Sequence, residues 1–251
     1  MTGRVRVLTG VLVIVVPLLF NLFFFLLQAT FSYPDILRDP AAEILRRFEA
    51  GGPSLIALWY GFALTPALFI PTAVLFRRVF PEGPALLDLA TPLAVVAGLV
   101  QVLGLVRRPF LVPSLAQAYL DPGSSEATRD AVVTVFAAFH QYAGVAVGEQ
   151  LGYLFTALWT LVIAGAMLSA PLFRPWLGWV GMVAALGVLA GLLEPFGIEF
   201  AGTINAAAYI VWSMWLIVAG VFLLRAASSG VTPVPATVVG GVGLTAGMKQ
   251  G

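Results

Sequence analysis

Long apolar runs with at most one charged residue alternate with short polar segments along most of the chain. Six of these runs are about 17 to 23 residues long, enough to cross roughly 30 Å of hydrocarbon as a helix. The pattern predicts transmembrane helices at residues 7–27, 54–76, 85–106, 149–169, 177–193 and 203–224. We therefore expect an all-α integral membrane bundle of six transmembrane helices, formed by residues 1–225 as a single domain.

The segments between and after the runs differ in character. Before the fourth run, Val132, Phe136, Phe139 and Tyr142 recur at helical spacing, which predicts an amphipathic interfacial helix. Residues 40–53 begin with proline and end in Gly-Gly-Pro, a pattern typical of a short surface helix. The last residues, 226–251, are rich in Gly, Ser, Thr, Pro and Val, and we expect them to form a flexible, disordered tail.

Positive charge beside the helix ends predicts the orientation of the bundle. Six helices place both termini on one side, and Lys and Arg close to helix ends favour the cytoplasmic side. On the side of the termini the basic residues lie in short segments directly beside helix ends: Arg4, Arg6, Arg77, Arg78, Arg174, Arg225 and Lys249. We therefore expect a multi-pass protein of the cell inner (cytoplasmic) membrane with both termini in the cytoplasm.

The amino-acid composition indicates a membrane protein and excludes several kinds of catalytic and cofactor site. Of the 251 residues, 60% are hydrophobic and 10% are charged, whereas about a quarter of an ordinary soluble domain is charged. The formal net charge of +1 gives no special attraction to nucleic acid, so we expect no nucleic-acid partner. The chain has no cysteine and one histidine, which excludes thiolate catalysis and a haem held by two histidines of one chain. We expect neither a metal nor a cofactor.

Polar residues within the predicted helices gather in the outer, extracytoplasmic halves. They are Asn21, Gln28, Gln101, Arg107, Arg108, Glu149, Tyr153, Glu194, Asn205 and Tyr209. The inner halves are nearly all apolar. Because polar groups in the membrane are costly unless they are paired or hydrated, the pattern predicts a polar cavity open to the extracytoplasmic side. A hydrogen-bonded network that ties the helices together is the alternative interpretation.

The charged residues of this group allow two arrangements. Arg107 and Arg108 can hold an anionic head group, or an arginine can pair with Glu149 or Glu194. His140 is a further candidate, either as a proton carrier or as a metal ligand beside Glu149. On a continuous α-helix, however, nine residues place these two side chains about 180° apart, so we expect them not to converge. A lone histidine on an amphipathic segment is more often a surface or packing residue.

Short motifs in the third to fifth runs resemble those of a known family. They are Arg108-Pro109-Phe110 with Pro113, Glu149-Gln150-Leu151-Gly152-Tyr153 with Trp159-Thr160, and Trp176-Leu177-Gly178-Trp179 with Gly181. The chain resembles, over roughly residues 54–224, a bacterial polytopic membrane family known only as a domain of unknown function. The resemblance implies six helices and no established reaction, ligand or catalytic residue. It also implies that Arg108, Glu149, Tyr153 and Trp159 are recurring polar and aromatic landmarks.

Three functions are compatible with these patterns. The leading hypothesis is binding of a small amphipathic or lipid-like ligand in the outer cavity, or a role as an accessory subunit beside a membrane partner. It rests on clustered polar groups without a reaction motif such as HExxH, GxSxG or a P-loop. The alternative is a membrane enzyme acting on a lipid or isoprenoid-like substrate, with Glu149 as acid or base. A transporter is the third, and the lack of internal repeats argues against it.

Overall fold

The computed structural model describes residues 3–81, 85–198 and 200–228, and every regular element in these ranges is helical. The α-helices are α1 (Gly3–Phe31), α2 (Ala41–Arg77), α3 (Ala90–Phe110), α4 (Val112–Leu120), α5 (Glu126–Phe139), α6 (Gly152–Ser169), α7 (Pro175–Ala190) and α8 (Ala201–Ser228). The shorter elements are the 3-10 helices η1 (Asp35–Arg38), η2 (Ala85–Leu89) and η4 (Gly191–Phe196), and the π-helix η3 (His140–Leu151).

Six helical stretches of the described residues are long and apolar enough to cross a membrane. They are Gly3–Phe31, Ala41–Arg77, Ala85–Leu120, Glu126–Ser169, Pro175–Phe196 and Ala201–Ser228. The predicted all-α class with six membrane-spanning helices is thereby confirmed. The predicted flexible tail at 226–251 lies outside the described residues from position 229 onward.

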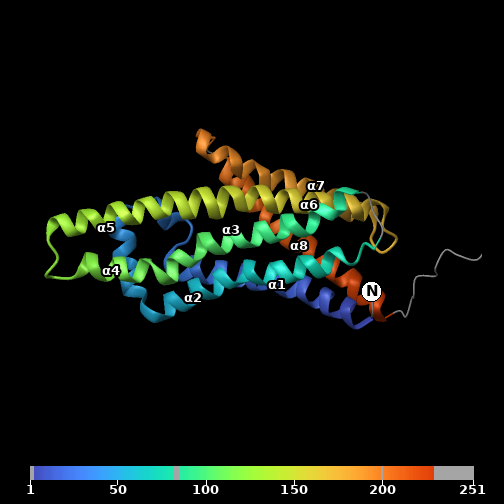
Figure 1. Cartoon of the computed structure of the whole chain (residues 1–251), viewed down its shortest axis with the longest axis horizontal. Helices are drawn as coiled ribbons and strands as arrows, with labels where there is room; N and C mark the ends of the chain where they lie inside the picture. The colour runs from blue at the N-terminus through green and yellow to red at the C-terminus, as the bar shows by residue number, and fades with distance from the viewer. Residues whose placement is uncertain (1–2, 82–84, 199, 229–251) are drawn as a thin grey trace, which may run out of the picture.

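Helices α2, α3, α5 and α6 run roughly along the long axis of the molecule, and α8 crosses it at an angle (Figure 1). Helices α3 and α4 follow one another in nearly the same direction, as do α5, η3 and α6. The start of α1 lies beside the end of α8, where the Arg6 guanidinium donates a hydrogen bond of 3.3 Å to the Ala226 carbonyl. Both ends of the described chain are therefore at the same end of the bundle.

The amphipathic segment before the fourth span is α5, and its direction differs from the expected one. Ser125 caps the helix by accepting a hydrogen bond of 3.1 Å from the Thr128 amide, and Glu126 stands in the first turn, where a carboxylate favours the helix dipole. No proline interrupts residues 126–169, so α5 continues through η3 into α6 instead of lying across the bundle (Figure 1). Its buried Val132 and Phe136 pack against the amino-terminal part of α2 and against α4.

Helix α2 joins the predicted short surface helix to the predicted second span. The predicted stop is marked by Gly52, whose φ of 55° and ψ of −153° break the helical path at a conformation that glycine adopts readily. Further on, Pro66 has no amide hydrogen to offer the Phe62 carbonyl four residues earlier. The Thr65 hydroxyl donates to that carbonyl at 2.8 Å, so the span continues through the proline without an orphaned acceptor.

The described residues form two large apolar cores along the length of the bundle and a smaller cluster of Ala157, Ala185, Val188 and Ala208 between α6, α7 and α8. At the end near the termini, Trp159 packs edge-on to Phe69 and close to Phe76, Trp212 and Trp215. The second core lies toward the other end and combines residues of α1, η1, α2, α4 and α5. Its members are Leu27, Phe31, Ile36, Ile44, Leu45, Phe48, Leu55, Trp59, Phe62, Val112, Ala116, Val132 and Phe136.

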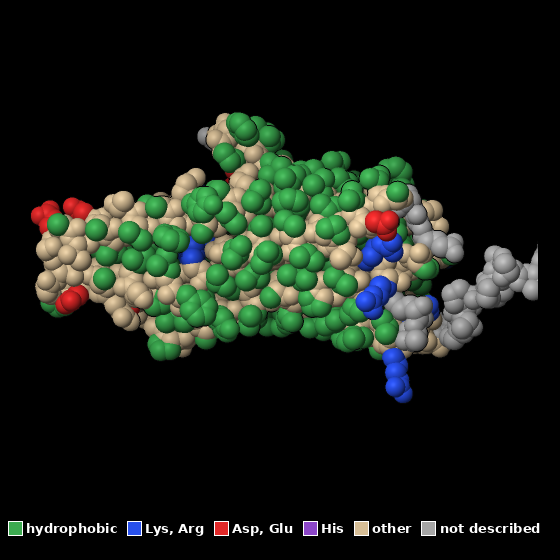
Figure 2. Space-filling view, in the orientation of Figure 1, with side chains coloured by type: hydrophobic (Ala, Val, Ile, Leu, Met, Phe, Trp, Pro, Cys, Tyr) green, Lys and Arg blue, Asp and Glu red, His purple; other side chains and the backbone are tan. Residues whose placement is uncertain are grey.

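Charge is distributed unevenly between the two ends of the molecule. Figure 2 shows basic side chains near the end where α1 begins, acidic side chains at the opposite tip, and hydrophobic side chains over most of the surface between them. The tip lies at the α4–α5 connection, with Asp121, Glu126 and Asp130 exposed. A multi-pass protein in a lipid bilayer follows from the six spans. The cytoplasmic position of the termini stays a prediction.

Candidate functional site

The candidate site is built around Arg108, near the end of α3. Its side chain is 1% exposed and is among the largest fully buried side chains of the described residues. The guanidinium carbon lies 5.1 Å from the ring centre of Trp59 on α2 and 5.8 Å from that of Phe136 on α5. Three helices therefore enclose one cationic group between two aromatic faces.

The hydrogen bonds of Arg108 are incomplete within the described part of the chain. Its Nη2 lies 3.5 Å from Nδ1 of His140, at the long limit of a hydrogen bond. Its Nε and Nη1 have no partner, and neither does the nearby indole Nε1 of Trp59. Of the two arrangements considered for Arg107 and Arg108, the ion pair with Glu149 or Glu194 is not formed within 4.0 Å; the ion pairs seen in the described chain include Arg38 with Asp35, Arg46 with Glu43 and Arg77 with Asp88. Burying a charged group whose N–H donors have no partner costs free energy of folding. A hydrogen-bond acceptor, and above all an anion, would satisfy these donors.

The π-helix η3 brings His140 and Glu149 toward the same side of the helix. Its i→i+5 bonding widens each turn, so about nine residues make two turns where an α-helix needs about seven. The expectation that the two side chains point about 180° apart assumed an α-helix, and it is wrong because residues 140–151 form a π-helix. Both side chains lie within electrostatic reach of Arg107 and Arg108. The His140 ring is also stacked on Phe136, with ring centres 6.1 Å apart and planes at 8°.

Glycines let η3 approach α3 closely. A Cβ on Gly148 would lie 2.9 Å from the Cα of Gly104, so this contact joins backbone to backbone. About one turn earlier in η3, Gly144 faces the Arg107 guanidinium, which a side chain would displace. Arg107 also donates through Nη1 to the Gly104 carbonyl. The glycine spacing thus makes room for Arg107 between the two helices, beside the half-buried Glu149.

Tyr33 belongs to this site although the sequence pattern did not single it out. It follows α1 directly, and its ring stands edge-on to Trp59 with ring centres 5.1 Å apart. Burial raises the pKa of Tyr33 to about 12, and the field of Glu149 acts in the same direction, while Arg108 and Arg107 oppose it. The phenol is therefore neutral at physiological pH and available as a hydrogen-bond donor. We call Tyr33, Trp59, Arg107, Arg108, Phe136, His140 and Glu149 the arginine cluster.

Several of the other predicted residues join helices through hydrogen bonds. Gln101 Nε2 donates to the Thr156 hydroxyl at 3.2 Å and links α3 to α6. Asn21 Nδ2 donates to the Ser213 hydroxyl at 2.9 Å and links α1 to α8. Asn205 Nδ2, on a residue that is 5% exposed, donates to the Val188 carbonyl at 2.7 Å and links α8 to α7. For these three amides the alternative interpretation, a packing network, describes the observed contacts.

Tyr153 and Tyr209 lie between this network and the arginine cluster. Their rings are half-buried and 5.9 Å apart, and Tyr209 lies beside Thr156. A cavity of about 30 Å³, large enough for about one water molecule, is lined in part by Gln101, Thr156 and Tyr209. Gln28 on α1 and Glu194 on η4 are exposed. In the described part of the chain the predicted residues thus form a charged cluster, a helix-linking network, a tyrosine pair and two surface positions, and they do not surround one large chamber.

A comparison with known protein families identifies the chain. A family model described as "Domain of unknown function (DUF4386)" matches residues 8–224. The chain belongs to the DUF4386 family. The resemblance noted from the motifs around Arg108, Glu149 and Trp176 is confirmed, and the match also includes most of the first span. Searches of curated proteins and of solved structures gave no match.

The chemistry open to this DUF4386 chain follows from the groups in the arginine cluster. No group of three or more His, Cys, Asp or Glu side chains that could hold a metal ion occurs among the residues described. The cluster instead offers N–H donors on Arg108 and Trp59, a neutral phenol on Tyr33 and a carboxylate on Glu149. Such a set can bind an anionic group by hydrogen bonds, with a carboxylate nearby that is able to exchange a proton.

Proposed function

We propose that this multi-pass membrane protein binds the anionic group of a small amphipathic ligand in the arginine cluster, with Arg108 as the principal donor. The observation that carries the proposal is the buried guanidinium whose Nε and Nη1 have no partner among the described residues. A guanidinium presents its N–H groups in a planar fork that matches the two oxygens of a carboxylate or phosphate. A bound anion would satisfy these donors and neutralise the charge together.

The surroundings of Arg108 favour an amphipathic ligand over a free inorganic ion. Two residues along the chain, Phe110 is 68% exposed and stands edge-on to Tyr60, with ring centres 5.8 Å apart. Tyr60 is itself 45% exposed. This exposed aromatic pair lies on the outer surface of the two helices that carry Trp59 and Arg108, so it offers an apolar surface to the tail of a molecule whose anionic head binds Arg108. The tail would stay along the lipid-facing side while the head reaches the arginine.

The proposal is tested by thermal unfolding of the purified full chain in a neutral detergent. Alkyl carboxylates, sulfates and phosphates of one chain length are compared with the alcohol of the same length. We expect the anionic amphiphiles to raise the unfolding midpoint, because a ligand that binds only the folded state stabilises it by mass action. Arg108→Gln should lose this rise, and Arg38→Gln, which alters an exposed arginine paired with Asp35, should keep it.

Two outcomes would reject the proposal. One is an equal response to the alcohol and the anions, which would mean that only the apolar tail binds. The other is an anion-dependent rise that survives in Arg108→Gln. The midpoint of Arg108→Gln without ligand shows whether the variant folds, so a loss of binding is distinguished from a loss of structure.

A second candidate function is catalysis by Glu149 on a lipid or isoprenoid-like substrate. The observation in its favour is a half-buried carboxylate that forms no ion pair within 4.0 Å in the described part of the chain, although Arg107, Arg108 and Tyr33 are near. An acid or base needs such a carboxylate free to exchange its proton. Incubation with a membrane lipid extract, followed by mass spectrometry of the lipids, compares Glu149→Gln with the exposed control Glu49→Gln. Any turnover that Glu149→Gln retains in full excludes this role.

A further inference from the structure

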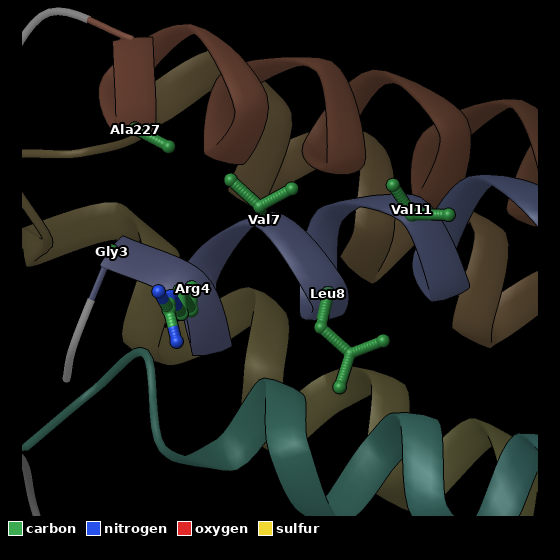
Figure 3. A pocket seen from close by; sticks show the side chains of 6 residues that line it. All are labelled: Gly3, Arg4, Val7, Leu8, Val11 and Ala227. Atoms are coloured by element: carbon green, nitrogen blue, oxygen red, sulfur yellow. The ribbon is translucent and has the colours of Figure 1, made fainter.

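A groove lies at the opposite end of the bundle from the arginine cluster, where α1 begins and α8 ends. Its volume is about 510 Å³, and it is lined by Gly3, Arg4, Val7, Leu8, Val11 and Ala227. Arg4, Val7, Leu8 and Val11 share one face of α1, and Figure 3 shows Val7 and Val11 on the part of that face nearer α8, which carries Ala227. We call this site the α1–α8 groove.

The lining of the groove is apolar with one cationic side chain among the described residues. Val7 is 43% exposed, Leu8 50% and Val11 41%, so these side chains are only partly covered by the described chain. Arg4, which is also exposed, lies one turn before them at the same end of α1. The order along the helix axis is therefore a charged position followed by an apolar strip. That order matches the head group and acyl chain of a lipid.

The charge of this end of the molecule selects the kind of lipid. Arg78 and Arg174 are exposed here, and Figure 2 shows basic side chains gathered at the end where α1 begins. The acidic side chain Asp88 is already paired with Arg77 at 2.9 Å. The local field is positive, which attracts an anionic head group and gives no advantage to a zwitterionic one.

We infer that the α1–α8 groove binds an anionic phospholipid, with an acyl chain along Val7, Leu8 and Val11 and the phosphate near Arg4. The inference does not depend on the arginine cluster, because the groove lies at the other end of the bundle. The bound lipid belongs to the membrane leaflet on the side where both ends of the described chain lie. A second copy of the chain is the competing occupant of the same apolar strip.

Native mass spectrometry of the full chain tests the inference directly. The protein in detergent is mixed with phosphatidylglycerol and phosphatidylcholine of identical acyl chains, and the bound lipid is counted. The wild type should retain more phosphatidylglycerol. Arg4→Gln should reduce this preference about fivefold, the effect of one basic residue near an anionic head group. Val7→Trp, which fills the groove, should reduce retention of both lipids, and Arg174→Gln, at the same end but outside the lining, should behave as the wild type.

Because the chain has no cysteine, a single introduced cysteine can be cross-linked without background, which gives a second, independent test. A single cysteine introduced as Val11→Cys should resist oxidative cross-linking in phosphatidylglycerol bilayers, because the lipid covers it. Rapid formation of a disulfide-linked dimer would show that a second copy occupies the groove and would overturn the inference. Equal retention of the two lipids by the wild type would overturn it too, as would an Arg4→Gln or Val7→Trp variant that matches Arg174→Gln.

Discussion

Replacing Arg108 by methionine should make the unliganded protein more stable. The substitution gives a shorter, flexible apolar side chain and removes a buried charge with two unpartnered N–H groups. Each such group costs about 1–3 kcal/mol when it is buried without a partner. The aromatic contacts with Trp59 and Phe136 that are lost contribute about 1–2 kcal/mol each. The net expectation is a gain of about 1 kcal/mol in the free energy of unfolding, or about 2–4 °C in the midpoint.

Thermal unfolding in detergent measures this effect, and Arg77→Met is a matched control. Each nitrogen of the Arg77 guanidinium donates a hydrogen bond. Nε donates to the Leu87 carbonyl at 3.0 Å, Nη1 to the Phe80 carbonyl at 2.5 Å and Nη2 to Asp88 at 2.9 Å. The same chemical change should therefore lower the midpoint there, by about 2 kcal/mol in free energy of unfolding. Opposite signs for the two substitutions are the expected result.

The reasoning is refuted if Arg108→Met lowers the midpoint as Arg77→Met does. Arg108 would then be a structural residue whose donors are satisfied, and the argument for an anion would fail with it. If the midpoint rises as expected, the chain keeps Arg108 at a cost in stability. Such a cost is characteristic of residues retained for binding.

Three further predictions concern the packing and the pH response of the bundle. Asn205→Leu should lower the free energy of unfolding by about 1 kcal/mol, seen as a lower unfolding midpoint, because the hydrogen bond from α8 to the Val188 carbonyl is lost while that carbonyl keeps the Gly191 amide as a donor; Ser228→Ala, at the exposed end of α8, serves as the control. Gly148→Leu should prevent the close approach to Gly104 and cost about 3 kcal/mol or more, measured by the fraction of protein that elutes as a folded species in detergent. Raising the pH from 10 to 12 should destabilise the protein, because the pKa of Tyr33 is about 12 when folded and near 10 when unfolded, so stability is lost as the phenol ionises. Tyr33→Phe should remove its part of that pH dependence in a titration of the midpoint, and an unchanged slope would show that Tyr33 does not contribute.

The spans were predictable from the sequence because the bilayer imposes a simple rule on them. Any crossing helix needs about 20 apolar residues, and this requirement is visible without knowledge of the neighbours. The start of α5 at Glu126 depends on a signal of the same local kind, because its cap, Ser125, is the residue directly before it. The direction of α5 was not, because it depends on whether helical bonding continues through residues 140–151.

The arginine cluster was only partly predictable. Arg108, Arg107, Glu149 and His140 were candidates because charge inside a span is conspicuous. The partners of Arg108 could not be read from the chain, because they are aromatic rings from two other helices. Tyr33 looked like an ordinary loop residue, and it reaches the site only because the loop after α1 folds back onto α2.

The π-helix is the feature that sequence reasoning missed most completely. An α-helical period was assumed between His140 and Glu149, and that assumption separated two residues that η3 places on one side. The available signal was the spacing of Gly144 and Gly148, which permits a close helix pair but does not specify the hydrogen-bond pattern. Such a pattern depends on tertiary contacts between η3 and α3.

The unbroken course of residues Glu126–Ser169 has a practical consequence. These 44 residues form a rod of roughly 60 Å, about twice the thickness of the hydrocarbon layer. The turn between α4 and α5 must then stand well clear of the head groups, where an antibody or a protease can reach it. An epitope inserted at Gly123 would report which face of the membrane the rod emerges from, without disturbing any helix.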